Sequence, residues 1–243
     1  MTGGSTGIGA AVAMAFAGCG AIVGVHYNSS RDEAEAVAAQ ARSAGARAFT
    51  EQADLTVNGS AGALVERVVA RQGRLDILIN NAGTIIGRRP TTDIDDHFYR
   101  SLIDLNLTSV VMSCRAVIPV SRKQRSGTII NTTSIAARLG GGPGTTVYAA
   151  MKAAVATFTR GLAKELALDG IRVNAVAPGV IQTPLHDRFT PPEVMEAFRA
   201  SIPLGRLGIP ADMVGAYLFL ASDDLAGYIT SQVIEVNGGM LMP

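Results

Sequence analysis

Short apolar segments alternate with segments of helical periodicity along nearly the whole chain. The segments predicted as strands lie at residues 21–26, 47–52, 75–79, 127–132, 172–177 and 232–236. The segments predicted as helices lie at about residues 34–45, 61–73, 95–123, 148–168 and 211–221. Strands separated by helices pair in parallel and are covered on both faces. The pattern therefore predicts an α/β fold with a doubly wound parallel sheet.

No internal repeat, linker or low-complexity stretch interrupts this alternation, so we expect a single domain over residues 1–243. That length is ordinary for one α/β domain, and its 48% of hydrophobic residues can build one sizeable core. The proline-rich segment 182–210 shows only a short helical patch, and we expect it to form a lid over the substrate.

Charge and hydropathy argue against several classes of protein. The formal net charge of +1 lacks the basic excess of a nucleic-acid-binding protein. No run reaches the roughly 18 continuous strongly apolar residues that a membrane span needs. The first residues also lack the basic start and apolar stretch of a signal peptide, so we expect a cytoplasmic protein. The three histidines do not show metal-ligand spacing, and we expect no metal site.

A glycine-rich loop, Thr2-Gly3-Gly4-Ser5-Thr6-Gly7-Ile8-Gly9, opens the chain and is followed at once by an alanine-rich helical run. Glycines at such a place let the backbone turn sharply and approach a pyrophosphate, whose charge is favoured at the helix N-terminus. By itself the loop is weak evidence, because glycine-rich turns before helices are common. Its G-x-x-x-G-x-G spacing also differs from the usual dinucleotide-binding fingerprint.

Tyr148 and Lys152 are four residues apart in a predicted helix, so they share one helix face. An ammonium group beside a phenol favours phenolate, and we expect it to lower the pKa of Tyr148 from about 10. Ser134 follows a predicted strand and Tyr148 opens the next helix, which places both at the carboxyl edge of the sheet. Ligands of open α/β sheets bind at that edge.

Together these motifs resemble the classical subgroup of the short-chain dehydrogenase/reductase family, over essentially the whole chain. The motifs are Thr2 to Gly9, Asp54-Leu55, Asn80-Asn81-Ala82-Gly83, Asn106, Ser134, Tyr148-x-x-x-Lys152, and Pro178-Gly179 with Thr183. The resemblance implies a Rossmann fold and hydride transfer between a nicotinamide cofactor, NAD(H) or NADP(H), and a small alcohol or ketone.

The resemblance also implies a role for each matching residue. Tyr148 would act as general acid and base, Ser134 would orient the reacting oxygen, and Lys152 would tune Tyr148 and hold the nicotinamide ribose. Asn106 would complete a proton relay through water. The implied cofactor contacts are Thr2, Gly3, Ser5, Thr6, Gly7, Ile8, Gly9, Asp54, Leu55, Asn81, Ala82, Gly83, Tyr148, Lys152, Pro178, Gly179, Ile181 and Thr183.

The end of the strand predicted at residues 21–26, which corresponds to the second strand of the family, bears on the choice of coenzyme. An acidic residue there would bind the ribose hydroxyls of NAD and repel the 2′-phosphate of NADP. This chain has Tyr27 in that place, followed by Asn28, Ser29 and Arg31, which offer hydrogen-bond donors and one positive charge. We therefore expect NADP(H) to be favoured over NAD(H).

The sequence leaves the substrate open between a 3-oxoacyl or general ketone and a sugar or polyol. Arg122, Lys123 and Arg125 could recognise an acidic acyl carrier, whereas Asp169 stands where carrier-binding enzymes can present a basic residue. Arg88 and Arg89 could meet an anionic substrate, although a solvated loop is the more ordinary interpretation. An alternative from a different functional class is a non-catalytic nucleotide-binding protein with the same fold.

Two expectations concern assembly and the amino terminus. The helices predicted at 95–123 and 148–168 have more apolar surface than one sheet face covers, and in the family they form a four-helix interface, so we expect a homotetramer or homodimer. Family members also carry a short apolar strand before the Thr-Gly motif, and here only Met1 precedes it. We expect the first strand to be missing, from a protein with roughly six to ten more residues.

Overall fold

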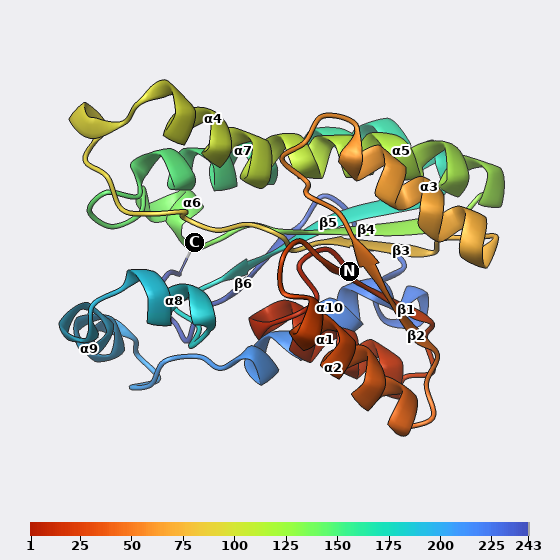
Figure 1. The fold of residues 1–243 in the computed structure, drawn as a ribbon, viewed down its shortest axis with the longest axis horizontal. Coiled ribbons are helices and arrows are strands. Elements are labelled where there is room, and N and C mark those ends of the chain that lie inside the picture. Colours follow the sequence, from red (N-terminus) through yellow and green to blue (C-terminus); the bar gives the residue numbers. More distant parts are fainter. Residues whose placement is uncertain (243) are drawn as a thin grey trace.

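The computed structural model describes residues 1–242, and its strands are all parallel (Figure 1). The strands are β1 (Val23–Tyr27), β2 (Ala48–Gln52), β3 (Ile77–Asn80), β4 (Gly127–Thr132), β5 (Ile171–Pro178) and β6 (Val233–Val236). They form a two-stranded sheet, β1-β2, and a four-stranded sheet in the order β3-β4-β5-β6. The predicted strands are confirmed to within two residues at each end.

Helices cover both faces of these sheets, as the alternating pattern predicts (Figure 1). On one face lie α1 (Gly7–Gly18), α2 (Arg31–Ser43) and α10 (Pro210–Ala221). On the other face lie α3 (Ser60–Gln72), α4 (Asp96–Ile103), α5 (Ser109–Gln124) and α7 (Thr146–Leu166). The shorter helices are α6 (Ala136–Leu139), α8 (Pro184–Phe189), α9 (Pro192–Ser201) and α11 (Asp223–Ala226), with single turns η1 (Thr91–Asp93), η2 (Asp104–Thr108) and η3 (Ala167–Asp169).

Each helical layer has its own apolar core against the strands. Val12 and Tyr217 are fully buried beside Val25 of β1, in the layer of α1 and α10. In the other layer, Val155 of α7 is fully buried with Val173 of β5. The strands are therefore covered on both sides, as their nearly continuous apolar sequences require.

The helix predicted over 95–123 is interrupted. Its two α-helical parts, α4 and α5, are joined by the π-helical turn η2, which carries the buried Asn106. Such turns insert a residue into a helix and often occur at functional positions. By length and composition alone, residues 96–124 form one helix long and apolar enough to cross a membrane. Its residues Val110, Cys114 and Val117 are buried in the core beside β3, β4 and β5.

The segment 182–210 contains two helices, α8 and α9, where the sequence suggested one short patch. Pro184 and Pro192 occupy the first helical positions, where a missing N–H costs nothing. The segment is joined at its base by a bridge between Ile181 and Gly208.

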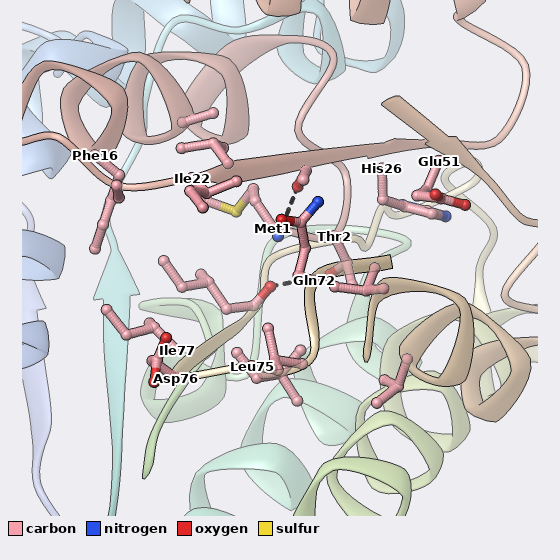
Figure 2. A pocket seen from close by; sticks show the side chains of 18 of the residues that line it. Met1, Thr2, Phe16, Ile22, His26, Glu51, Gln72, Leu75, Asp76 and Ile77 are labelled. Carbon is pink, nitrogen blue, oxygen red and sulfur yellow. Dashed lines mark hydrogen bonds between the residues drawn. The ribbon is translucent and has the colours of Figure 1, made fainter. Parts of the chain in front are cut away.

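Between β1 and β3 a cavity of about 470 Å³ occupies the place of a central strand (Figure 2). Met1 and Thr2 span its upper end: the Met1 amine donates to Gly24 O at 3.0 Å, and Thr2 N–H donates to Ile79 O at 3.0 Å. The sheet is therefore open between β1 and β3, and Met1 and Thr2 are hydrogen-bonded to the two flanking strands there.

Candidate active site

A second cavity, of about 380 Å³, lies at the carboxyl ends of the strands, where the glycine loop meets the segments that follow β3, β4 and β5. It brings together most of the residues selected from the sequence. The predicted site residues that line it are Gly3, Ser5, Thr6, Gly7, Ile8, Asn81, Ala82, Gly83, Ser134, Tyr148, Lys152, Pro178, Gly179, Ile181 and Thr183.

The glycine loop is shaped by close backbone approaches. Gly3 has a positive φ of 59°, and a side chain at Gly9 would overlap the Gly3 carbonyl oxygen. The Asn81 amide fixes the turn by donating from Nδ2 to Thr2 O at 3.2 Å and to Gly3 O at 3.0 Å. Thr2 Oγ1 in turn accepts from the backbone N–H groups of Asn81 and Ala82, at 2.9 and 3.1 Å. Thr2 and Gly9 thus support the loop without lining the cavity.

The loop fits a dinucleotide phosphate. Helix α1 begins at Gly7 beside the cavity, its first turn contains no acidic residue, and no side chain caps its N-terminal N–H groups in the described chain. Those N–H groups and the helix dipole favour an anion at this position. The loop residues could therefore hold the pyrophosphate of a nicotinamide dinucleotide.

His26 supports the glycine loop, a role that its local sequence does not reveal. Its Nδ1 accepts from Gly3 N–H at 3.0 Å, so its Nε2 carries the proton and donates to Ala53 O at 3.0 Å. Burial lowers the pKa of His26 to about 4, which keeps the ring neutral. The histidine thereby ties the glycine loop to the residue before Asp54.

Tyr148 and Ser134 approach each other across the cavity from α7 and the segment after β4. Burial raises the pKa of Tyr148 to about 12, and the nearby Ser134 hydroxyl has a smaller effect that lowers it. The direction is opposite to the one expected from the Tyr148–Lys152 spacing. Burial favours the neutral phenol, so Tyr148 keeps its proton at neutral pH.

Lys152 is 3% exposed and donates from Nζ to Thr132 O at 2.9 Å. Its Nζ lies 5.7 Å from the centre of the Tyr148 ring. Burial lowers the pKa of Lys152 to about 8, because the charged ammonium is disfavoured away from water. Both groups therefore shift toward their neutral forms.

Asn106 lies at the base of the site on η2, fully buried. Its Nδ2 donates to Thr84 O and Leu102 O, each at 3.0 Å. Its Oδ1 has no hydrogen-bond partner within residues 1–242. A side chain at Gly83 would come within 2.8 Å of this oxygen and 3.0 Å of Lys152 Nζ. Both atoms thus approach Gly83 closely, and the unpaired amide oxygen can accept a hydrogen bond from a water.

The remaining predicted cofactor residues do not line the cavity: Tyr27, Asn28, Ser29, Arg31, Asp54 and Leu55. Tyr27 ends β1, and Arg31 begins α2 as an exposed side chain. The Asp54 carboxylate accepts from the N–H and hydroxyl of Thr56, at 2.9 and 2.6 Å. Leu55 is buried in a small core with Ala61 and Leu64 of α3.

Known proteins match this chain over its full length. A family model described as enoyl-(acyl carrier protein) reductase matches residues 3–241. The 3-oxoacyl-[acyl-carrier-protein] reductase of Synechocystis sp. is 40% identical, over 100% of this chain and 96% of that protein.

Solved structures agree in fold. An NADH-dependent reductase, A1-R′, responsible for alginate metabolism has a TM-score of 0.91 and 38% identity, over 100% of this chain and 96% of its own. A putative NAD(P)-dependent gluconate 5-dehydrogenase from Beutenbergia cavernae, with bound NADP, has a TM-score of 0.91 and 36% identity, over 98% and 94%. The chain belongs to the short-chain dehydrogenase/reductase family and is an NAD(P)-dependent oxidoreductase that interconverts an alcohol and a ketone by hydride transfer.

Proposed function

We propose that Tyr148 is the general acid of this oxidoreductase and that its preferred reaction is the reduction of a small ketone. One observation carries the proposal: Ser134, Tyr148 and Lys152 line the same cavity as the glycine loop. A bound nicotinamide dinucleotide supplies the hydride. The reacting oxygen then needs a hydrogen-bond donor that polarises it and a proton as it becomes an alkoxide.

Ser134 and Tyr148 meet those two needs. The high pKa of Tyr148 keeps its hydroxyl protonated, so it can give a proton to the nascent alkoxide. Lys152 lies close enough to stabilise the tyrosinate that remains. In this proposal a water bound to the unpaired Asn106 Oδ1 returns a proton through the lysine. Lys152 also holds the nicotinamide ribose in this proposal, and segment 182–210 of a single-domain enzyme acts as the lid.

For the substrate we propose a 3-oxoacyl or general ketone, in line with the name of the Synechocystis relative. The alternative is a sugar or polyol, in line with the name of the gluconate 5-dehydrogenase. One contact favours the alternative over an acyl carrier: Arg122 Nε donates to Asp169 Oδ2 at 2.7 Å, which neutralises part of the basic cluster expected to meet a carrier.

A panel assay tests these proposals. The purified protein is mixed with NADPH and with ketones, aldehydes and β-keto esters, and in the oxidative direction with NADP⁺ and sugars or polyols. Reduction of the β-keto esters supports the first substrate class, and oxidation of sugars or polyols supports the second. Absence of turnover in both directions with tight coenzyme binding would make the chain a non-catalytic nucleotide-binding protein.

For the coenzyme we propose a preference for NADP(H) over NAD(H). Tyr27 ends β1 without an acidic group that would repel a 2′-phosphate, and Arg31 is exposed at the start of α2. The comparisons include an NADH-dependent reductase and a structure with bound NADP, so both coenzymes occur among similar proteins.

We also propose a cytoplasmic homotetramer, or a homodimer, formed through α4, α5 and α7. Leu107, Ile118 and Phe158 are only partly buried against their own core, and they supply apolar surface to a partner. Most soluble oligomers close by two-fold symmetry. Sedimentation at micromolar concentration tests the proposal, since a species of only 25.2 kDa would contradict it.

A further inference from the structure

Arg88 lies in the cavity wall, although a solvated loop was the more ordinary interpretation of its sequence. Its guanidinium makes three hydrogen bonds to two separate segments. Nε donates to Phe189 O at 2.8 Å, one Nη to Thr190 Oγ1 at 3.1 Å, and the other to Pro143 O at 3.2 Å. The side chain therefore joins the 182–210 lid to the glycine-rich 140–144 loop beside the catalytic residues.

The backbone around Arg88 is also fixed. Ile86 adopts a positive φ of 59°, which is costly for a β-branched residue, and Gly87 N–H closes a tight turn onto Ile85 O at 2.6 Å. On the other side, Arg89 N–H donates to Gly144 O at 3.0 Å. The guanidinium is thus held in place from both its backbone and its tip.

The charge of Arg88 has no carboxylate partner within residues 1–242. Its three acceptors are neutral oxygens, and a guanidinium has five N–H donors, so two remain for a ligand. The adjacent Arg89 differs, because its guanidinium pairs with Asp95 at 2.7 Å. Burial lowers the pKa of Arg88, but the group stays charged at neutral pH.

The charged side chains that line the cavity beside Arg88 are all positive. They are Arg88 and Lys152, and over the described chain the lining includes no aspartate or glutamate. Lys152 is engaged with Thr132 and Tyr148 at the reaction centre. The glycine loop supplies N–H groups for the cofactor phosphates, and none of the Arg88 contacts belongs to that loop. Arg88 is therefore a positive charge available to the substrate.

We propose that Arg88 binds a carboxylate of the substrate, so that the enzyme acts on ketones that carry a free carboxylate, the oxo acids, and on the corresponding hydroxy acids. A carboxylate matches the fork of a guanidinium and forms stronger hydrogen bonds than a neutral oxygen does. His186 shares Thr190 Oγ1 with Arg88, at 3.0 Å from Nδ1, and completes the polar wall. The inference rests on the proposed ketone reduction at Tyr148, and it favours an oxo acid over its ester.

Matched pairs of substrates test this subsite. We would compare acetoacetate, 4-oxopentanoate and 5-oxohexanoate with their methyl esters, using NADPH oxidation by the full-length enzyme. At least one acid is expected to exceed its ester by about tenfold or more in kcat/KM, mainly through KM. Arg88→Gln should abolish this preference, with a larger fall in kcat/KM for the acid than for its ester. Arg88→Lys should keep part of it, because it keeps the charge and loses the fork.

Arg89→Gln is the matched control, since Arg89 is the next residue and its charge is already paired. It should leave the preference for acids unchanged. Equal kcat/KM for each acid and ester in the parent enzyme would overturn the proposal, as would an Arg88→Gln loss that is equal for acid and ester.

A thermal-shift measurement with NADPH and each acid needs no turnover, so it separates the subsite from the chemistry. Stabilisation by an acid that is lost in Arg88→Gln supports the subsite even if the ketone is not reduced. Absence of stabilisation by every acid, together with absence of turnover, would overturn it.

Discussion

The Lys152 ammonium lies 5.7 Å from the centre of the Tyr148 ring and directs a hydrogen bond to the Thr132 carbonyl oxygen, at 2.9 Å. In this arrangement burial determines both pKa values, to about 12 for Tyr148 and about 8 for Lys152. A protonated tyrosine suits ketone reduction, because the acid is already in place. In the proposed mechanism the lysine stabilises the tyrosinate only after the proton has left.

Tyr148→Phe tests the proposed acid. The change removes the transferable proton and keeps the ring, so kcat should fall by about 10²-fold or more, while the Kd of the coenzyme changes little. Tyr228→Phe is the control, because Tyr228 is fully exposed and should show parent activity. A Tyr148→Phe enzyme with near-normal turnover would refute the assignment. Lys152→Ala should impair both kcat and coenzyme binding.

Gly83→Ala tests the space between Asn106 and Lys152. The added methyl group would lie 2.8 Å from Asn106 Oδ1 and 3.0 Å from Lys152 Nζ, so it displaces the ammonium and excludes a bridging water. We expect kcat to fall by about 10²-fold, the scale of a small misplacement in a catalytic site. Gly62→Ala in α3 meets nothing within 4 Å and should keep full activity. Equal kcat values for the two variants would show that the close approach of Asn106 and Lys152 to Gly83 is not needed for turnover.

The sequence predicted the parallel strands and the carboxyl-edge location of the site well, because hydrophobic periodicity and chain connectivity determine both. It located Ser134, Tyr148 and Lys152 through motif spacing, and the structure brings them into one cavity. It predicted the wrong direction for the pKa of Tyr148, because spacing on a helix says nothing of how deeply a side chain is buried. It also could not foresee η2, since five residues are too few for the wider π-helical turn to show in the hydrophobic pattern.

Contacts between segments that are distant in the chain also could not be predicted from the sequence. His26 supports the glycine loop because β1 lies beside it, and Arg88 lines the cavity because two loops fold over it. Each looked like an ordinary polar residue in its local sequence. Tertiary packing, not local pattern, decides which polar side chains face a cavity.

The buried His26 makes stability depend on pH. Its pKa is about 4 in the folded protein, below the ordinary value of 6.5, so the unfolded chain binds more protons between these two values. The free energy of unfolding should therefore rise as pH increases from about 4 to 6.5, by about 3 kcal/mol from this group. His26→Gln should remove this contribution in urea titrations across that range. His97→Gln, at an exposed histidine, should leave it intact, and a pH dependence equal in both variants would contradict the prediction.

Coenzyme preference should follow the residues at the end of β1. Tyr27→Asp should shift the ratio of kcat/KM values toward NADH, because a carboxylate accepts from the ribose and repels a 2′-phosphate. Arg31→Ala should weaken NADPH binding more than NADH binding. Arg47→Ala is the control, because it removes an exposed arginine just before β2, beside the start of β1 and away from Tyr27. It should change the binding of neither coenzyme. Equal losses for both coenzymes in Arg31→Ala would mean that Arg31 does not contact the phosphate.

The cavity between β1 and β3 should accept an added strand in one register. The bonds of Met1 and Thr2 show that Gly24 and Ile79 direct backbone groups into this space, and alternation directs those of Ile22 and Ile77 there as well (Figure 2). A residue placed ahead of Met1 would donate to Ile77 O and accept from Ile79 N–H. The residue before it would pair in the same way with Ile22 O and Gly24 N–H.

Such an extension would also remove a buried charge. Burial lowers the pKa of the Met1 amine to about 6, because the ammonium is disfavoured at this position. A peptide N–H would donate to Gly24 O without that cost. Each buried backbone group that gains a partner contributes about 1–3 kcal/mol.

We therefore expect Val-Ala-Leu-Val fused ahead of Met1 to raise Tm by about 10 °C or more and to tighten coenzyme binding, since the added strand supports the glycine loop. Val-Pro-Leu-Pro is the matched control, because proline lacks the N–H that must reach Ile77 O. It should give little or no gain in either quantity. Equal Tm values for the two extensions would show that apolar burial alone accounts for the effect, and no change with either would show that the cavity does not accept a strand.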